Sequence, residues 1–111
     1  MAQSTSMADF HVKLRVSIDE TISSLLGKSV LETLHEYFIK EYDLTPDKIP
    51  YRLDTFVGVL DNVFGVPGSR IIRRVIARDF YSKIGLRFME SENLSLHEYL
   101  DQAKRTITIP D

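Results

Sequence analysis

The chain contains no cysteine among its 111 residues. It can therefore form neither disulfides nor thiolate metal sites, and it is compatible with a reducing compartment. It also lacks any apolar run close to the roughly 20 residues that a membrane-spanning helix needs, and its amino terminus lacks the apolar centre of a signal peptide. We therefore expect a cytoplasmic protein with no membrane partner.

The remaining composition is that of an ordinary globular domain. Hydrophobic residues make up 43% of the chain and charged residues 27%. A single domain of this length buries about 65% of the surface that its unfolded chain exposes. The net charge of −2 conceals an asymmetry, because residues 51–88 hold seven basic and three acidic side chains while the rest holds seven and thirteen. Such asymmetry favours either attraction within the fold or a basic face for an anionic partner. The acidic remainder argues against non-specific coating of nucleic acid.

Residues 53–86 organise the chain and are predicted to form two helices with a corner between them. An apolar stripe at helical spacing marks the first helix: Leu53, Phe56, Val57, Leu60, Val63 and Phe64. Gly65 can adopt the left-handed conformation that ends a helix, and Pro67 cannot extend the same hydrogen-bond ladder. Ser69 is predicted to cap the second helix.

The second helix combines an apolar arc with the densest positive charge of the sequence. The predicted arc contains Ile71, Ile72, Val75, Ile76, Phe80 and Ile84. Arg70, Arg74 and Arg78 recur every four residues and form a ridge on the opposite side, with Arg73 near its boundary. Asp79 falls within the apolar arc. Because a buried carboxylate needs a partner, we expect Asp79 to form a buried ion pair with Arg52 or Arg73.

The flanking regions supply further elements. Residues 1–9 are predicted to be a disordered extension, and residues 10–111 a single domain. Residues 10–16 alternate apolar and polar side chains, which favours a strand, although a helical face through Ile18 and Ile22 competes. This strand could pair with β-prone residues 106–109. Helices are expected over about 18–26, 30–42 and 96–104, each opened by a Ser-x-x-Glu capping box at Ser17, Ser29 or Ser95. A short helical turn is expected at Pro46.

No catalytic or cofactor-binding pattern stands out. Gly27-Lys28-Ser29 lacks the earlier glycine of a phosphate-binding loop, since Ile22 occupies that position, and a helix corner explains these residues. The histidines, His11, His35 and His97, lie on separate predicted elements. We expect no metal, no cofactor and no small-molecule substrate, and an enzyme is the least favoured function class.

The four arginines of the second helix carry the sharpest functional alternative. A helix, a glycine corner and a basic helix resemble a helix-turn-helix, in which Arg70, Arg73, Arg74 and Arg78 would contact DNA phosphates and bases. Asp61 and Arg74 count against this motif, because they occupy positions where it usually has a small and an apolar residue. The competing interpretation is a solvated face bridged to the chain's own carboxylates.

Residues 18–88 resemble a small archaeal domain, the Nitrosopumilus-type output domain. The matching segments include Leu26-Gly27, Ile49-Pro50-Tyr51-Arg52, Phe64-Gly65, Ile71-Ile72 and residues 81–85. The resemblance implies an all-helical signalling or transcription-related output module without known chemistry, and it supplies no catalytic residues.

These observations together predict a mainly α domain, a compact bundle of about five helices with a possible short pair of terminal strands. Three function classes are ranked. The first is a non-catalytic regulatory module that binds protein partners and forms a homodimer. The alternative is a DNA-binding regulator that uses residues 53–86, and the third is an enzyme.

Overall fold

A computed structural model describes residues 7–91 and 93–108 and confirms the mainly α fold. It contains α1 (Met7–Leu26), α2 (Lys28–Tyr42), the short 3-10 helix η1 (Pro46–Tyr51), α3 (Leu53–Lys83) and α4 (Leu96–Thr108). The described residues include no strand. The described residues form five helical segments, in line with the predicted bundle of about five, and the predicted helical turn at Pro46 is the start of η1.

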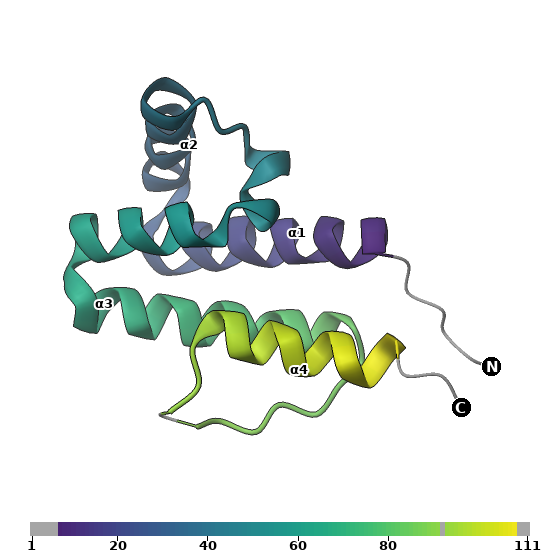
Figure 1. Cartoon of the computed structure of the whole chain (residues 1–111). Helices are drawn as coiled ribbons and strands as arrows, with labels where there is room; N and C mark the ends of the chain where they lie inside the picture. Colours follow the sequence, from purple (N-terminus) through teal and green to yellow (C-terminus); the bar gives the residue numbers. More distant parts are fainter. Residues whose placement is uncertain (1–6, 92, 109–111) are drawn as a thin grey trace.

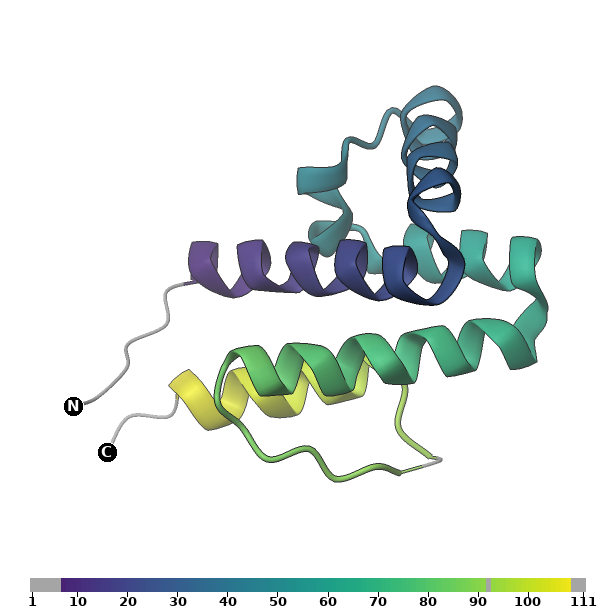
Figure 2. The same ribbon diagram turned by 180° about the vertical axis from the view of Figure 1, so that it is seen from behind.

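The helices form two layers (Figures 1 and 2). One layer contains α1 and the first half of α3 (residues 53–64), and α2 stands across it. The other contains α4 and the second half of α3 (residues 66–83). Because α3 contributes to both layers, it contacts both α1 and α4.

The predicted strand at residues 10–16 is wrong, because these residues belong to α1. Phe10, Leu14, Ile18 and Ile22 are each only 1% exposed, whereas Val12 is 58% exposed. Burial therefore follows every fourth residue of a helix rather than every second residue of a strand. The first six residues of the predicted extension lie outside the described part, and the last three belong to α1.

The predicted partner strand at residues 106–109 is also wrong where it is described, because residues 106–108 complete α4. Ile109 lies outside the described residues. A terminal strand pair is therefore not formed by the described residues.

Gly27 and Gly65 interrupt the helices at the predicted positions. Gly27 has φ 101° and separates α1 from α2. Gly65 has φ 77° and ψ 156°, the non-helical conformation at which α3 bends back on itself. Both φ values lie in the region where a Cβ atom is disfavoured, which explains why glycine occupies these two corners. After the bend, the two halves of α3 run antiparallel (Figure 1).

Only one of the three predicted capping boxes forms. Glu98 Oε1 accepts a hydrogen bond from Ser95 N at 2.8 Å, and Ser95 Oγ accepts one from Glu98 N at 3.2 Å. Ser17 instead lies buried within α1, and Ser29 is the second residue of α2 rather than its cap. Ser69 is also not a cap, since it is buried within α3.

The core joins both layers through aromatic and aliphatic side chains. The rings of Phe10 and Phe80 meet edge to face at 4.8 Å, and those of Phe38 and Phe56 lie 5.9 Å apart. Ile72 is buried as predicted, but Ile71 is 59% exposed. The buried arc of α3 is therefore narrower than predicted. On the other helices, α4 buries Leu96, Tyr99, Leu100 and Ala103, whereas Tyr37 and Ile39 of α2 are exposed.

Candidate functional site

A cavity of about 220 Å³ lies between the second half of α3 and the start of α4. Three of the four predicted binding arginines line it: Arg70, Arg73 and Arg74. The loop and α4 contribute polar side chains on the other side, including Asn93, Ser95 and Glu98. We call this site the arginine cavity.

Arg73 is fixed by groups within α3. Its Nε donates to Ser69 Oγ at 3.0 Å and to the Ser69 carbonyl at 3.3 Å. Its Nη2 lies 3.6 Å from Asp61 Oδ1, which belongs to the first half of the helix. The Arg73 side chain is only 16% exposed. This arginine therefore joins the two halves of α3 across the bend.

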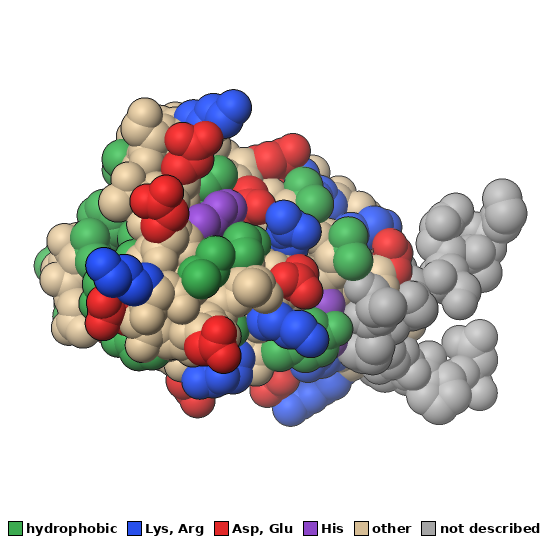
Figure 3. Space-filling model, turned by 90° about the horizontal axis from the view of Figure 1, so that it is seen from above, with side chains coloured by type: hydrophobic (Ala, Val, Ile, Leu, Met, Phe, Trp, Pro, Cys, Tyr) green, Lys and Arg blue, Asp and Glu red, His purple; other side chains and the backbone are tan. Residues whose placement is uncertain are grey.

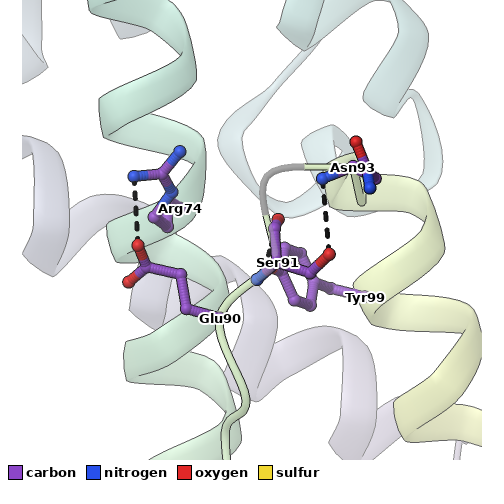
Figure 4. A network of polar contacts seen from close by, with 5 residues as sticks. All are labelled: Arg74, Glu90, Ser91, Asn93 and Tyr99. Atoms are coloured by element: carbon purple, nitrogen blue, oxygen red, sulfur yellow. Dashed lines mark hydrogen bonds and ion pairs between the residues drawn. The ribbon is translucent and has the colours of Figure 1, made fainter.

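Arg74 is bound to the loop that leads into α4 (Figure 4). Its Nη1 donates to Glu90 Oε2 at 3.3 Å, and 51% of the Glu90 side chain is exposed. The same loop is held to α4, because Tyr99 Oη accepts from Ser91 N at 2.8 Å and donates to the Ser91 carbonyl at 3.0 Å.

A second tyrosine, which lies on α3, supports Tyr99 and thereby the loop. Tyr81 Oη donates to the Tyr99 carbonyl at 2.5 Å. Burial raises the pKa of Tyr81, and the nearby Tyr99 contributes to the same shift. Two tyrosines therefore connect α3, the loop and α4 beneath the arginine cavity.

Arg70 and Arg78 differ from the other two arginines. Both are exposed, and neither forms a hydrogen bond or ion pair with the residues that the structure describes. Arg70 lines the arginine cavity, whereas Arg78 is not among its lining residues. Within the described chain, Arg73 and Arg74 therefore have ion-pair partners, whereas Arg70 and Arg78 do not.

The predicted buried pair of Asp79 and Arg52 is replaced by a different interaction. Asp79 Oδ2 lies 3.3 Å from Lys83 Nζ, and the Asp79 side chain is 37% exposed. Arg52 is exposed at the start of α3. The alternative partner, Arg73, pairs with Asp61. Asp79 lies at the edge of the narrow buried arc, where the lysine one turn later can reach it.

Lys83 also connects the two layers, because its Nζ donates to Glu20 Oε1 of α1 at 2.6 Å. This hydrogen bond raises the pKa of Lys83, and Asp79 adds to the shift.

The three histidines each contact a different residue of the described chain. His35 Nε2 is 3.0 Å from Asp19 Oδ1, and His97 Nε2 is 3.2 Å from Asp54 Oδ1. His11 stacks on Tyr51 with ring centroids 4.1 Å apart. Among the described residues, no group of three or more His, Asp or Glu side chains is placed to hold a metal ion.

A second hollow, of about 360 Å³, lies between α2 and the bend of α3. We call it the apolar hollow, because none of its lining residues is ionisable: Ser29, Val30, Thr33, Leu34, Val63 and Phe64. Val63 is 52% exposed, although the sequence pattern placed it in the core, and Val66 just beyond Gly65 is 49% exposed. Hydrophobic side chains are visible at this end of the molecule, along the left edge of Figure 3.

Sequence reasoning missed the apolar hollow. Two valines flanking the glycine corner were the available signal, since residues at a bend leave the helical arc that faces the core.

Comparison with known proteins yields no match to a family model, a curated protein or a solved structure. The resemblance to an output domain therefore stays a prediction. No helix within residues 7–91 and 93–108 is long and apolar enough to cross a membrane.

Proposed function

We propose that the protein is a non-catalytic regulatory module that acts through protein–protein contacts and associates with a second copy of itself. The observation that carries this proposal is the apolar hollow, a depression whose described lining is uncharged and includes the exposed Val63. The resemblance of residues 18–88 to signalling output domains supports the same function class.

The chemistry of the hollow is that of an interface core. Charged side chains make up 27% of the chain, yet none lines this hollow. The centres of protein interfaces are similarly depleted of charge, whereas bulk surface is not. By contrast, a larger hollow of about 520 Å³ beside η1 is lined by Asp43, Asp47, Lys48 and Arg52, which makes it the weaker candidate for an apolar contact.

A second copy is the partner that best fits the shape of this surface. In a twofold contact the same patch must supply both the protruding and the receiving groups. The patch supplies a receiving surface in the lining of the hollow and an exposed apolar side chain in Val63, which is 52% exposed. In the proposed dimer, Val63 of one copy contacts the hollow of the other.

Sedimentation measured over a range of protein concentrations tests this proposal. The wild-type protein should show concentration-dependent self-association, and Val63→Asp should sediment as a monomer, because it places a charge in the apolar contact. Val12→Asp is the matched control, since Val12 is 58% exposed on α1 and does not line the hollow.

Two results would contradict the proposal. A wild-type monomer at every concentration removes self-association, and equal loss of association in both variants removes the hollow as its location. Helical circular dichroism and a thermal melt establish that each variant is folded.

DNA binding is the second candidate, favoured by Arg70 and Arg78, which are exposed and have no ion-pair partner among the described residues. It ranks lower because Arg73 and Arg74 have partners within the chain, and because the halves of α3 run antiparallel, unlike the roughly 90–120° arrangement of a helix-turn-helix. If it holds, a salt titration of duplex binding should lose about one unit of log–log slope in Arg78→Ala. An unchanged slope, or no binding, argues against it.

A further inference from the structure

We propose that the arginine cavity binds the dianion of a phosphomonoester. This inference is independent of self-association, because the cavity and the apolar hollow have no lining residue in common.

The charge of the lining favours an anion. Among the described lining residues, three are arginines and one, Glu98, is a carboxylate, while Asp61 and Glu90 outside the lining pair with Arg73 and Arg74. The Glu98 carboxylate is already engaged at the start of α4, where it accepts the hydrogen bond from Ser95 N at 2.8 Å. Arg70 has no carboxylate partner among the described residues, so its donors are available to a ligand.

One of the arginines is held in position by neutral groups before any ligand arrives. Arg73 Nε donates to the hydroxyl and the carbonyl of Ser69. Guanidinium groups present several N–H donors in one plane, an arrangement that matches the oxygens of phosphate. A fixed guanidinium loses less conformational freedom on binding than a mobile one, which favours affinity.

Glu90 acts as an internal competitor for the ligand. Its carboxylate is half exposed and contacts Arg74 at 3.3 Å, where a phosphate oxygen would bind. A dianion with three terminal oxygens can contact more than one arginine, whereas this singly charged carboxylate contacts only Arg74 among the described residues. Removal of the Glu90 charge should therefore strengthen phosphate binding.

The size of the cavity and its position at α4 agree with a small ligand. A volume of 220 Å³ equals that of roughly seven liquid water molecules, enough for a phosphate group and a few attached atoms. Leu96, the first residue of α4, also lines the cavity. The positive end of the helix dipole therefore adds to the attraction from the arginines.

Amide chemical shifts measured at constant ionic strength test the proposal, with inorganic phosphate and O-phosphoserine as probes. Both should cause saturable shifts at residues 93–98. Arg70→Ala should weaken the binding about tenfold, as expected for loss of a hydrogen bond to a charged group. Arg78→Ala is the matched control, because Arg78 is also exposed on the same helix but is not among the lining residues of the cavity. Glu90→Gln should bind several times more tightly.

Three outcomes would overturn the proposal. The first is the absence of saturable shifts with either probe. The second is equal weakening by Arg70→Ala and Arg78→Ala, which would indicate general charge attraction. The third is binding of duplex DNA or dimethyl phosphate that matches binding of the monoester, which would assign the arginines to phosphodiesters. Since Arg70 is exposed and has no partner within residues 7–91 and 93–108, Arg70→Ala should leave the fold intact.

Discussion

The apolar hollow and the arginine cavity lie on either side of the bend at Gly65, yet their chemistry is opposite. Val63 and Phe64 end the first half of α3, which contains no basic residue, and they line the hollow. Arg70, Arg73 and Arg74 follow a few residues later and line the cavity. One glycine in a non-helical conformation thus allows a continuous segment to contribute to two unrelated surfaces.

The comparison also shows that charge counted along a sequence overstates the charge available to a ligand. The described lining of the apolar hollow contains no charged side chain, so no ion pair is needed there. In the cavity, Arg73 and Arg74 already face Asp61 and Glu90. Only Arg70 remains without such a partner among the cavity arginines in the described chain. The arginine that should matter most for binding is therefore the exposed one.

The largest expected effect concerns the core that supports both surfaces. Ile72→Ala should lower the free energy of unfolding by about 2–5 kcal/mol, because Ile72 is buried and its truncation leaves a cavity. Ile71→Ala should change it by less than about 0.5 kcal/mol, since Ile71 is 59% exposed. Denaturant titration of the two variants measures the difference. A similar loss of unfolding free energy in both variants would mean that the boundary between buried and exposed residues of α3 does not separate Ile71 from Ile72.

The next test asks whether the two surfaces are independent. Val63→Asp should abolish self-association and leave phosphate binding within about twofold of wild type, while Arg70→Ala should do the reverse. The surfaces share no lining residue, and effects at separate sites are usually additive. Sedimentation and the phosphate titration are applied to both variants. If either variant impairs both properties, the surfaces are coupled through the bend.

A smaller effect is expected at the wall of the arginine cavity. Ser95→Ala should cost about 1 kcal/mol by removing the cap of α4. Ser17→Ala should instead stabilise the protein by about 1 kcal/mol, because the buried Ser17 hydroxyl has no hydrogen-bond partner in the described structure. Both serines stand three residues before a glutamate. Thermal melts of the two variants therefore compare the same Ser-x-x-Glu motif inside a helix and at a helix start. Equal destabilisation would mean that Ser17 contributes a polar contact.

The smallest effect is a loss of stability at alkaline pH. Tyr81 and Lys83 have raised pKa values in the folded state, so the folded protein retains their protons more strongly than the unfolded chain. Their contributions are complete below the ordinary pKa values of 10.0 and 10.5 and are lost as the pH rises through the folded values. Melts across this range should show a decline, and the decline should be shallower in Tyr81→Phe. If stability declines with pH as steeply in Tyr81→Phe as in the wild type, Tyr81 does not contribute to the decline.

Local signals predicted most of the helix ends. Gly27 and Gly65 were identified as corners because only the backbone of a few neighbouring residues decides whether a left-handed φ is needed. The box at Ser95 formed because that serine stands at the start of a helix. The predicted box at Ser17 did not form, because Ser17 lies inside α1, which begins at Met7. A cap motif is therefore informative only once the helix start is known.

The candidate sites were predicted in part. The arginines were identified by their spacing, but their division into paired and unpaired residues depends on Asp61 and Glu90, which approach only after α3 bends and the loop folds back. The pairing of Asp79 with Lys83 instead of Arg52 has a similar origin, because the buried arc proved narrower than its pattern suggested.

The sequence alone determined that the chain is helical, where α3 bends, and which helix carries the arginines, because periodicity, glycine geometry and charge are properties of neighbouring residues. Tertiary structure alone decided that residues 10–16 are helical, that Val63 borders an exposed hollow, and that Arg73 pairs with Asp61 while Arg70 has no such partner in the part of the chain that the structure describes. These outcomes depend on which surfaces meet when the layers pack, and burial and ion pairing exist only after distant segments have come together.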